Sequence, residues 1–303
     1  MATEDSQITQ SQKSAESLAH RAIEDLALEA DSSVEQMLRL VDRLHRAERP
    51  KPEEVVPIDL GNEATAPQEK RLPRLDWDKC LQTFPVLHPK CKREYIESFR
   101  LLRARVSLAK REWAAGGALL QVLAIVSTSS REGKSFVATN LAAALAIGSD
   151  EKVLIVDLNP LSNELSSSLG ILKGPGVSEA MNSGQWESSV RQVGETNLYV
   201  LPAGRVAESR LDGIDFRRVP MLLESLRGTF AWIIIDGPAH ADSSDAELLS
   251  NYADANLLVV QKGVTEFNEV AQLKEGIPEG RLLGAVLNNQ SLKKSKSWFR
   301  RGE

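Results

Sequence analysis

The amino-acid sequence predicts an α/β fold in which helices cover both faces of a mostly parallel sheet. From residue 121 onward, short apolar runs alternate with helical stretches. Continuous apolar runs are typical of strands buried on both faces, and their alternation with helices is typical of βαβ units. The predicted strands are Val122–Val126, Val153–Val156, Leu198–Leu201, Trp232–Ile235, Leu257–Val260 and Leu282–Leu287. In a parallel sheet of this kind, ligands bind at the carboxyl ends of the strands.

The composition is that of an ordinary globular protein and excludes some function classes. Of the 303 residues, 42% are hydrophobic and 26% are charged, and the net charge is −5. An acidic chain is a poor electrostatic partner for nucleic acid, so no nucleic-acid partner is expected. The polar first ten residues do not resemble a signal peptide, and no apolar run reaches the about 18 residues of a membrane span. We therefore expect a cytoplasmic protein that reaches the inner face of the cell membrane only as a peripheral partner.

The chain divides into four predicted segments. These are a small helical hairpin at 1–47, a proline-rich linker at 48–90, the α/β domain at 91–290 and a basic tail at 291–303. In the hairpin, apolar residues recur at the i, i+3, i+4 and i+7 spacing of amphipathic helices. Each helix has a single apolar stripe, so the hairpin is expected to pack on something, either the body of this chain or a partner. Within the domain, a first helix is expected from about Lys92 to Lys110.

The first predicted strand leads into a glycine-lysine-serine loop that precedes a helix at Phe136–Ala146. Strand, loop, Gly-Lys-Ser and helix form the context of a Walker A motif. In such a loop the backbone N–H groups and the helix N-terminus bind phosphates. Lys134 would add a positive charge and Ser135 a hydroxyl for Mg²⁺. The predicted nucleotide-binding residues in the loop are Ser129, Ser130, Arg131, Glu132, Gly133, Lys134 and Ser135.

Two further predicted strands end in an aspartate, at Asp157 and Asp236. A carboxylate that follows four buried apolar residues is costly unless it meets a cation or a hydrogen-bond donor. One such aspartate could simply cap the next helix. Two of them at the same sheet edge as the loop favour a magnesium-nucleotide site instead, with Ser135, Asp157 and Asp236 as the predicted metal residues.

Several ordered segments resemble the bacterial tyrosine kinases of capsular and exopolysaccharide biosynthesis, which are relatives of the septum-site and partition ATPases. The stretch from about Glu94 to Asn288 carries this resemblance, over about two thirds of the chain. Its segments are SSREGKSFVATNLA (Walker A), VLIVDLNP (Walker A′), GVSEA, NLYVLPAG, WIIIDGP (Walker B) and GAVLN. The usual first glycine of Walker A is Thr128 here.

The resemblance implies a P-loop NTPase fold that binds ATP and Mg²⁺. It implies that Lys134 and Asp157 are catalytic, that Asp236 holds the metal, and that Asn288, which ends GAVLN, lies at the nucleotide. It also implies a regulator of polysaccharide synthesis or export that acts with a membrane-embedded chain-length or export partner. Its activity would be that of an ATPase or a tyrosine-kinase-like phosphotransferase.

Upstream of the loop, Glu97, Arg100 and Arg103 match the E-x-x-R-x-x-R helix of these kinases. Residues three apart share a helix face, so the three charges can meet one neighbour. The resemblance implies that this helix joins subunits, and a homo-oligomer is expected. A solvated charged face is the alternative interpretation.

The sequence also departs from the kinase pattern. Arg131 replaces a usual glycine, and Asn159 replaces the second acid of Walker A′. The chain has three tyrosines, none of them near the end, where the kinases carry a tyrosine cluster. Two other hypotheses therefore stay open. One is a positioning ATPase of the septum or partition type without kinase activity, and the other is a catalytically weak nucleotide-binding scaffold.

The tail at 291–303 contains five basic residues and one acid, with an adjacent tryptophan and phenylalanine. Such a segment can rest weakly on an anionic membrane surface. It can equally be a solvated basic tail.

Overall fold

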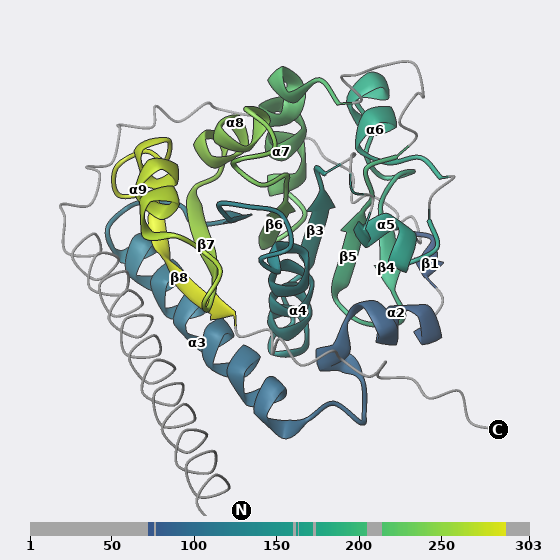
Figure 1. The fold of residues 1–303 in the computed structure, drawn as a ribbon. Helices are drawn as coiled ribbons and strands as arrows, with labels where there is room; N and C mark the ends of the chain where they lie inside the picture. The colour runs from purple at the N-terminus through teal and green to yellow at the C-terminus, as the bar shows by residue number, and fades with distance from the viewer. Residues whose placement is uncertain are drawn as a thin grey trace, which may run out of the picture.

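The computed structural model describes residues 72–75, 77–159, 162, 164–171, 174–204 and 214–288. The predicted hairpin at 1–47 and the predicted tail at 291–303 lie outside these residues, as does most of the predicted linker. Within the described residues the chain forms one sheet with helices on both faces (Figure 1). The predicted fold class is therefore confirmed for the domain.

The sheet has eight strands within the described part of the chain, and its order is β1-β4-β5-β3-β6-β2-β7-β8. The strands are β1 (Arg74–Leu75), β2 (Val122–Val126), β3 (Val153–Asp157), β4 (Arg191–Val193), β5 (Leu198–Leu201), β6 (Trp232–Asp236), β7 (Ala255–Gln261) and β8 (Leu282–Asn288). Every neighbouring pair is parallel except β4 and β5. The order places β2 between β6 and β7, at the centre of the parallel part.

The helices divide between the two faces of the sheet (Figure 1). They are α2 (Trp77–Thr83), α3 (Arg93–Ala115), α4 (Lys134–Ile147), α5 (Glu164–Ser168), α6 (Val177–Ser183), α7 (Val219–Arg227), α8 (Asp245–Tyr252) and α9 (Phe267–Glu275), with short 3-10 turns η1 (Pro85–Leu87) and η2 (Phe216–Arg218). Alternate residues of each central strand enter opposite cores, as the period of a strand requires. One core joins the sheet to α6, α7, α8 and α9, and the other joins it to α2, α3, α4 and α5.

The six predicted strands all form, with bounds that differ by at most two residues at an end. They are recognisable because β2, β3, β5 and β6 are buried at every position. The predicted first helix becomes α3, which begins within one residue of its expected start and runs five residues further.

The structure differs from the predicted linker at its C-terminal end. Residues from 72 onward, placed in the linker 48–90, form β1, α2 and η1. Cys80 and Phe84 are both fully buried there, in the same core as α4. The backbone N–H of Val86 also donates to Asn140 Oδ1 of α4, at 2.9 Å. These anchors pack the segment onto the domain although its composition is that of a linker.

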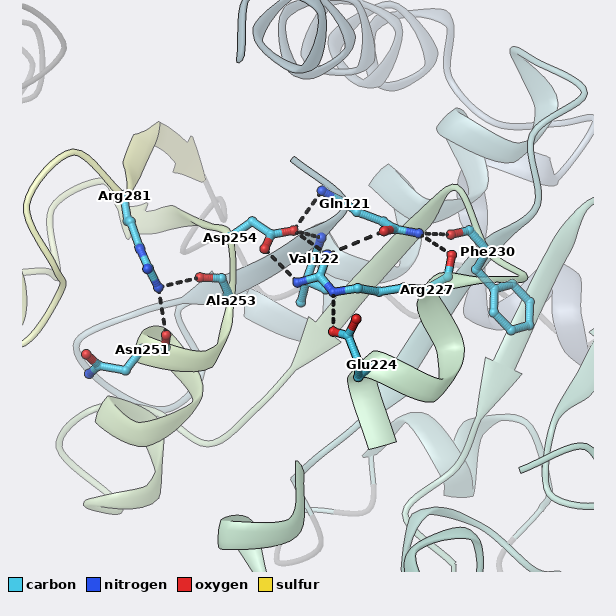
Figure 2. Close-up of polar contacts among 9 residues, drawn as sticks. All are labelled: Gln121, Val122, Glu224, Arg227, Phe230, Asn251, Ala253, Asp254 and Arg281. Carbon is cyan, nitrogen blue, oxygen red and sulfur yellow. Dashed lines mark hydrogen bonds and ion pairs between the residues drawn. The ribbon is translucent and has the colours of Figure 1, made fainter. Parts of the chain in front are cut away.

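A polar network fixes the start of β2, at the amino ends of the strands and thus at the end of the sheet opposite the loop (Figure 2). Asp254 accepts hydrogen bonds from the backbone N–H groups of Gln121 and Val122, at 2.8 and 2.7 Å. Its carboxylate also forms a two-pronged ion pair with Arg227, whose Nη1 and Nη2 lie 2.9 and 2.7 Å away. The Gln121 side chain donates to the backbone oxygens of Arg227 and Phe230. Thus α7, β2 and the α8–β7 turn are held together by groups that satisfy one another.

Among the described residues, no helix combines the length and the apolar character needed to cross a membrane.

Candidate functional site

The strand order brings the predicted loop and the two strand-terminal acids together at the carboxyl ends of three neighbouring strands. In the register of β3 and β6, Asp157 lies directly beside Asp236. In the register of β6 and β2, Asp236 lies beside Ile125, just before the loop that follows β2. Because these strands are parallel, their carboxyl ends meet at the same edge. Ser135 completes the group, since its hydroxyl hydrogen-bonds to Asp236.

The loop reaches α4 through two residues in the left-handed backbone region. Gly133 has φ 99° and Arg131 has φ 67°. A Cβ at Gly133 would lie 2.1 Å from Asn288 Nδ2, so only glycine fits both the backbone angle and the contact. Arg131 is the one non-glycine residue with positive φ among the described residues. This backbone region favours glycine, and a side chain there stores backbone strain.

Asn288 lies at the loop, as the resemblance implied, but its side chain contacts the protein. Its Nδ2 donates to the backbone oxygen of Glu132 at 2.9 Å. The end of β8 thereby holds the loop from the side. Asn288 is the last residue of β8, so the sheet itself positions this contact.

Glu132 is only 1% exposed, and its carboxylate is bonded within the protein. It accepts hydrogen bonds from the Thr128 hydroxyl and the Ser129 N–H, both at 3.0 Å. It also accepts a short hydrogen bond from the hydroxyl of Thr265, in the β7–α9 connection. Thr128 lies in addition 3.2 Å from Glu269 of α9. The Glu132 side chain therefore braces the loop, and only its backbone remains for a phosphate.

Lys134 begins α4 and is 6% exposed. Burial lowers the pKa of Lys134, while the nearby carboxylates of Asp236, Asp242, Glu132 and Glu164 oppose that change. The Lys134 ammonium partly neutralises the negative charge of these four carboxylates. The surplus of negative charge favours the binding of a further cation.

Asp157 is 1% exposed, and burial raises its pKa to about 6. Its carboxylate accepts hydrogen bonds from the Ser166 hydroxyl at 2.8 Å and from the Asn159 N–H at 3.1 Å. These donors favour the ionised form and limit the rise. A buried carboxyl group with a pKa near neutrality can accept a proton at physiological pH.

Asp236 is also 1% exposed, and burial together with the adjacent Asp157 raises its pKa to about 7. Its Oδ1 is buried and has no hydrogen-bond partner among the described residues. A buried charged oxygen without a partner is costly, and a site for a bound ion or water explains it. Asp236 therefore lies where a cation would supply the missing interaction.

These residues fit a magnesium nucleotide better than a bare metal. Within the described ranges, no three histidine, cysteine, aspartate or glutamate side chains come close enough to hold a metal ion by themselves. Mg²⁺ at phosphate sites usually retains waters and takes its other ligands from one or two protein oxygens and the phosphates. The Ser135 hydroxyl and the free oxygen of Asp236 suit that arrangement, and the N-terminus of α4 suits the phosphates.

The predicted subunit-contact residues do not all face the same way. Glu97 and Arg100 form an ion pair of 2.9 Å on α3, with 51% and 60% of their side chains exposed. Arg103 instead reaches α4, where its Nη1 donates to the backbone oxygen of Ala144 at 3.3 Å. A guanidinium at the C-terminal end of a helix is favourable. Glu97 and Arg100 remain available to a neighbour.

Sequence reasoning missed several polar residues of the site. Asp242 hydrogen-bonds to the Ser130 hydroxyl through a short contact. Its segment runs beside the loop, since the N–H groups of His240 and Ala241 donate to the backbone oxygens of Ser127 and Thr128. The six-residue spacing from Asp236 to Asp242 could have suggested this acid. Glu164 begins α5 beside the two aspartates, and Thr265 has no sequence signal at all.

Comparison with known protein families assigns the core of the chain. The CobQ/CobB/MinD/ParA nucleotide-binding domain family matches residues 123–295, which include the loop and both acids. Among curated proteins, the tyrosine-protein kinase YwqD of Bacillus subtilis is 26% identical over 205 residues, which are 67% of this chain and 84% of that protein. The tyrosine-protein kinase CpsD of Streptococcus agalactiae is 28% identical over 204 residues, which are 64% of this chain and 82% of that protein.

One relative is much longer than this chain and aligns with it over only part of its own length. The succinoglycan biosynthesis transport protein ExoP of Rhizobium meliloti is 29% identical over 182 residues. These are 58% of this chain but 23% of the length of ExoP. The chain therefore corresponds to one part of that larger protein.

Solved structures give the same result for the fold. The chimeric protein CapA2B2 matches with a TM-score of 0.58 and 26% identity, over 73% of this chain and 95% of that one. The kinase domain of the Escherichia coli tyrosine kinase ETK matches with a TM-score of 0.59 and 23% identity, over 77% and 86%. The predicted resemblance to bacterial tyrosine kinases is thus confirmed. The chain belongs to the CobQ/CobB/MinD/ParA nucleotide-binding domain family, and its similar proteins include bacterial tyrosine-protein kinases.

Proposed function

We propose that this protein is an ATP-dependent, tyrosine-kinase-like P-loop ATPase that regulates capsule or exopolysaccharide synthesis or export. The single observation that carries the proposal is the convergence of the Lys134 loop with Asp157 and with the unpartnered oxygen of Asp236. The polysaccharide part rests on its relatives, which include tyrosine-protein kinases and a succinoglycan biosynthesis transport protein.

In this proposal each residue of the site has one task. The backbone of residues 129–135 and the N-terminus of α4 bind the phosphates, and Lys134 neutralises their charge. Ser135 and Asp236 would hold Mg²⁺. Glu132 and Asn288 keep the loop in its binding shape.

Bound Mg-ATP would supply the phosphoryl group and the charge neutralisation that its transfer needs. The chain's own contribution is positioning and proton handling. Asp157 is held in place by Ser166 and Asn159 and has a pKa of about 6. It is therefore the group that we assign to orienting the attacking hydroxyl or water and accepting its proton.

Partners follow from the same relatives. We propose that copies associate through α3, with Glu97 and Arg100 exposed for the contact. We also propose a membrane-embedded polysaccharide chain-length or export protein as the partner. The basic tail at 291–303 would add a weak contact with anionic lipid at the inner face of the membrane.

A nucleotide-binding scaffold with little turnover is the second candidate. The strained Arg131 and the amide at Asn159, where the kinases have a glycine and an acid, favour it. A scaffold of this kind would bind Mg-ATP with the same residues but release no ADP.

The test is an assay of the purified chain with Mg-ATP in which ADP release and phosphotyrosine formation on a synthetic Glu-Tyr polymer are measured together. The kinase proposal predicts both products, and Asp157→Asn should abolish both while binding remains. The exposed Asp150→Asn, in the turn between α4 and β3, makes the same chemical change away from the site and is the matched control. ADP without phosphotyrosine would leave only an ATPase, and binding without ADP would favour the scaffold.

A further inference from the structure

The protein has three tyrosines, and all three lie in described parts of the chain. Tyr199 of β5 is 7% exposed and packs edge-on against Phe230, with ring centroids 5.4 Å apart. Tyr252 of α8 is partly buried against the core that α6, α7 and α9 share. Tyr95 of α3 is 42% exposed. A phosphoryl acceptor within this chain must reach a second molecule or its own nucleotide site, and exposure favours Tyr95.

The position of Tyr95 also connects it to the phosphate loop. It lies four residues before Phe99, which is about one helical turn. The Phe99 ring packs edge-on against Phe136, with centroids 5.8 Å apart. Phe136 directly follows Lys134 and Ser135 at the start of α4. The N-terminal part of α3 therefore packs against the same helix that would bind the phosphates.

The electrostatic surroundings of Tyr95 suit a phosphorylated product. Three exposed basic residues, Lys90, Lys92 and Arg93, precede it and outnumber the two nearest exposed acids, Glu94 and Glu97. Tyr95 is the third residue of α3, and the N-terminus of a helix stabilises negative charge. A phosphotyrosine carries about −1.5 to −2 charges at neutral pH, so both features favour it.

We propose that Tyr95 is the tyrosine that this protein phosphorylates on its own chain, an inference that rests on the proposed kinase function. The phenol oxygen of Tyr95 forms a bond to the γ-phosphorus of ATP, and the bond from that phosphorus to the bridging oxygen of ADP breaks. The phenol proton passes to a carboxylate such as Asp157, and ADP leaves.

The test uses the full chain incubated with Mg-ATP, digested with trypsin and analysed by mass spectrometry. Cleavage after Arg93 and Arg100 gives a peptide at 94–100 that contains Tyr95 but not the other two tyrosines. This peptide should gain one phosphoryl group. Fragment ions must place it on Tyr95, because Ser98 lies in the same peptide.

Tyr95→Phe should remove most of the phosphotyrosine on the chain and leave phosphorylation of a Glu-Tyr polymer unchanged. Tyr252→Phe is the matched control and should leave the chain phosphorylated. If the polymer is phosphorylated but Tyr95 is not, the Tyr95 assignment is overturned and the kinase proposal stands. If no phosphotyrosine forms on either substrate, the kinase proposal fails and the assignment fails with it.

Discussion

Replacing Asp236 with asparagine should stabilise the nucleotide-free protein at alkaline pH, although Asp236 is a central residue of the site. The carboxylate is buried beside Asp157, and its Oδ1 has no partner among the described residues. In its charged form it therefore costs folding free energy. An amide of the same shape removes the charge and keeps the volume.

The magnitude follows from the pKa. The pKa of Asp236 is raised from 3.8 to about 7, chiefly by burial. At about 1.4 kcal/mol for each factor of ten, this corresponds to about 4 kcal/mol once the group is charged. The asparagine NH₂ would in turn lack acceptors, which costs about 1–3 kcal/mol. The expected net gain for Asp236→Asn is therefore about 2 kcal/mol at pH 8.

The sign depends on pH in a defined way. Because the folded pKa is raised, the contribution of Asp236 to the stability of the wild-type protein is fully present below about pH 4 and is lost as pH rises through about 7. Asp157, with a pKa of about 6, contributes in the same direction. Asp236→Asn does not undergo the Asp236 part of this loss. Its free energy of unfolding should therefore exceed that of wild type at pH 8 but not at pH 5.

The assay is urea unfolding of the nucleotide-free protein at pH 5 and pH 8, in the presence of a chelator. Asp150→Asn makes the same chemical change at an exposed position away from the site and should alter the stability by less than about 0.5 kcal/mol. If Asp236→Asn were less stable than wild type at pH 8, or equally shifted at both pH values, the argument from burial would be refuted.

Two further predictions concern the brace of the loop and the network at the opposite sheet edge. Glu132→Gln and Thr265→Val each weaken the same hydrogen bond, so each should lower the affinity for Mg-ATP in calorimetry while the melting temperature changes little. The double variant should bind Mg-ATP no more weakly than the single variant with the lower affinity. Additive losses of affinity would contradict the idea that both residues act through one contact. Asp254→Ala removes the two-pronged partner of the partly buried Arg227, leaves the N–H groups of Gln121 and Val122 without their acceptor, and should cost about 3–5 kcal/mol in urea unfolding. The control Glu224→Ala removes a carboxylate that is 77% exposed and should cost less than about 1 kcal/mol; equal losses in the two variants would show that burial does not decide the effect.

The strands and the site acids could be predicted from the sequence for one physical reason. A strand buried on both faces must be apolar throughout, and an acid that ends such a strand stands out. Val122–Val126 and Trp232–Asp236 show this pattern. The strand Arg191–Val193 does not, because it is three residues long and only one of them is buried.

Other features depend on contacts that no local pattern encodes. The spacing of Glu97, Arg100 and Arg103 predicts a shared helix face, but not that Arg103 reaches the end of α4. The place of Glu132 in the motif suggests a phosphate contact, whereas in the structure its carboxylate accepts a hydrogen bond from Thr265, far along the chain. Two buried side chains, Cys80 and Phe84, are enough to pack a linker-like segment onto the domain.

The central claim is that the Lys134 loop and the two strand-terminal acids bind a magnesium nucleotide. Titration calorimetry of Mg-ATP into the wild-type protein and into Lys134→Ala tests it most directly. Lys152→Ala, at the opposite edge of the sheet, is the control. We predict that binding is lost in Lys134→Ala alone, with thermal unfolding still cooperative in all three proteins. Undiminished Mg-ATP binding by a folded Lys134→Ala protein would contradict the claim.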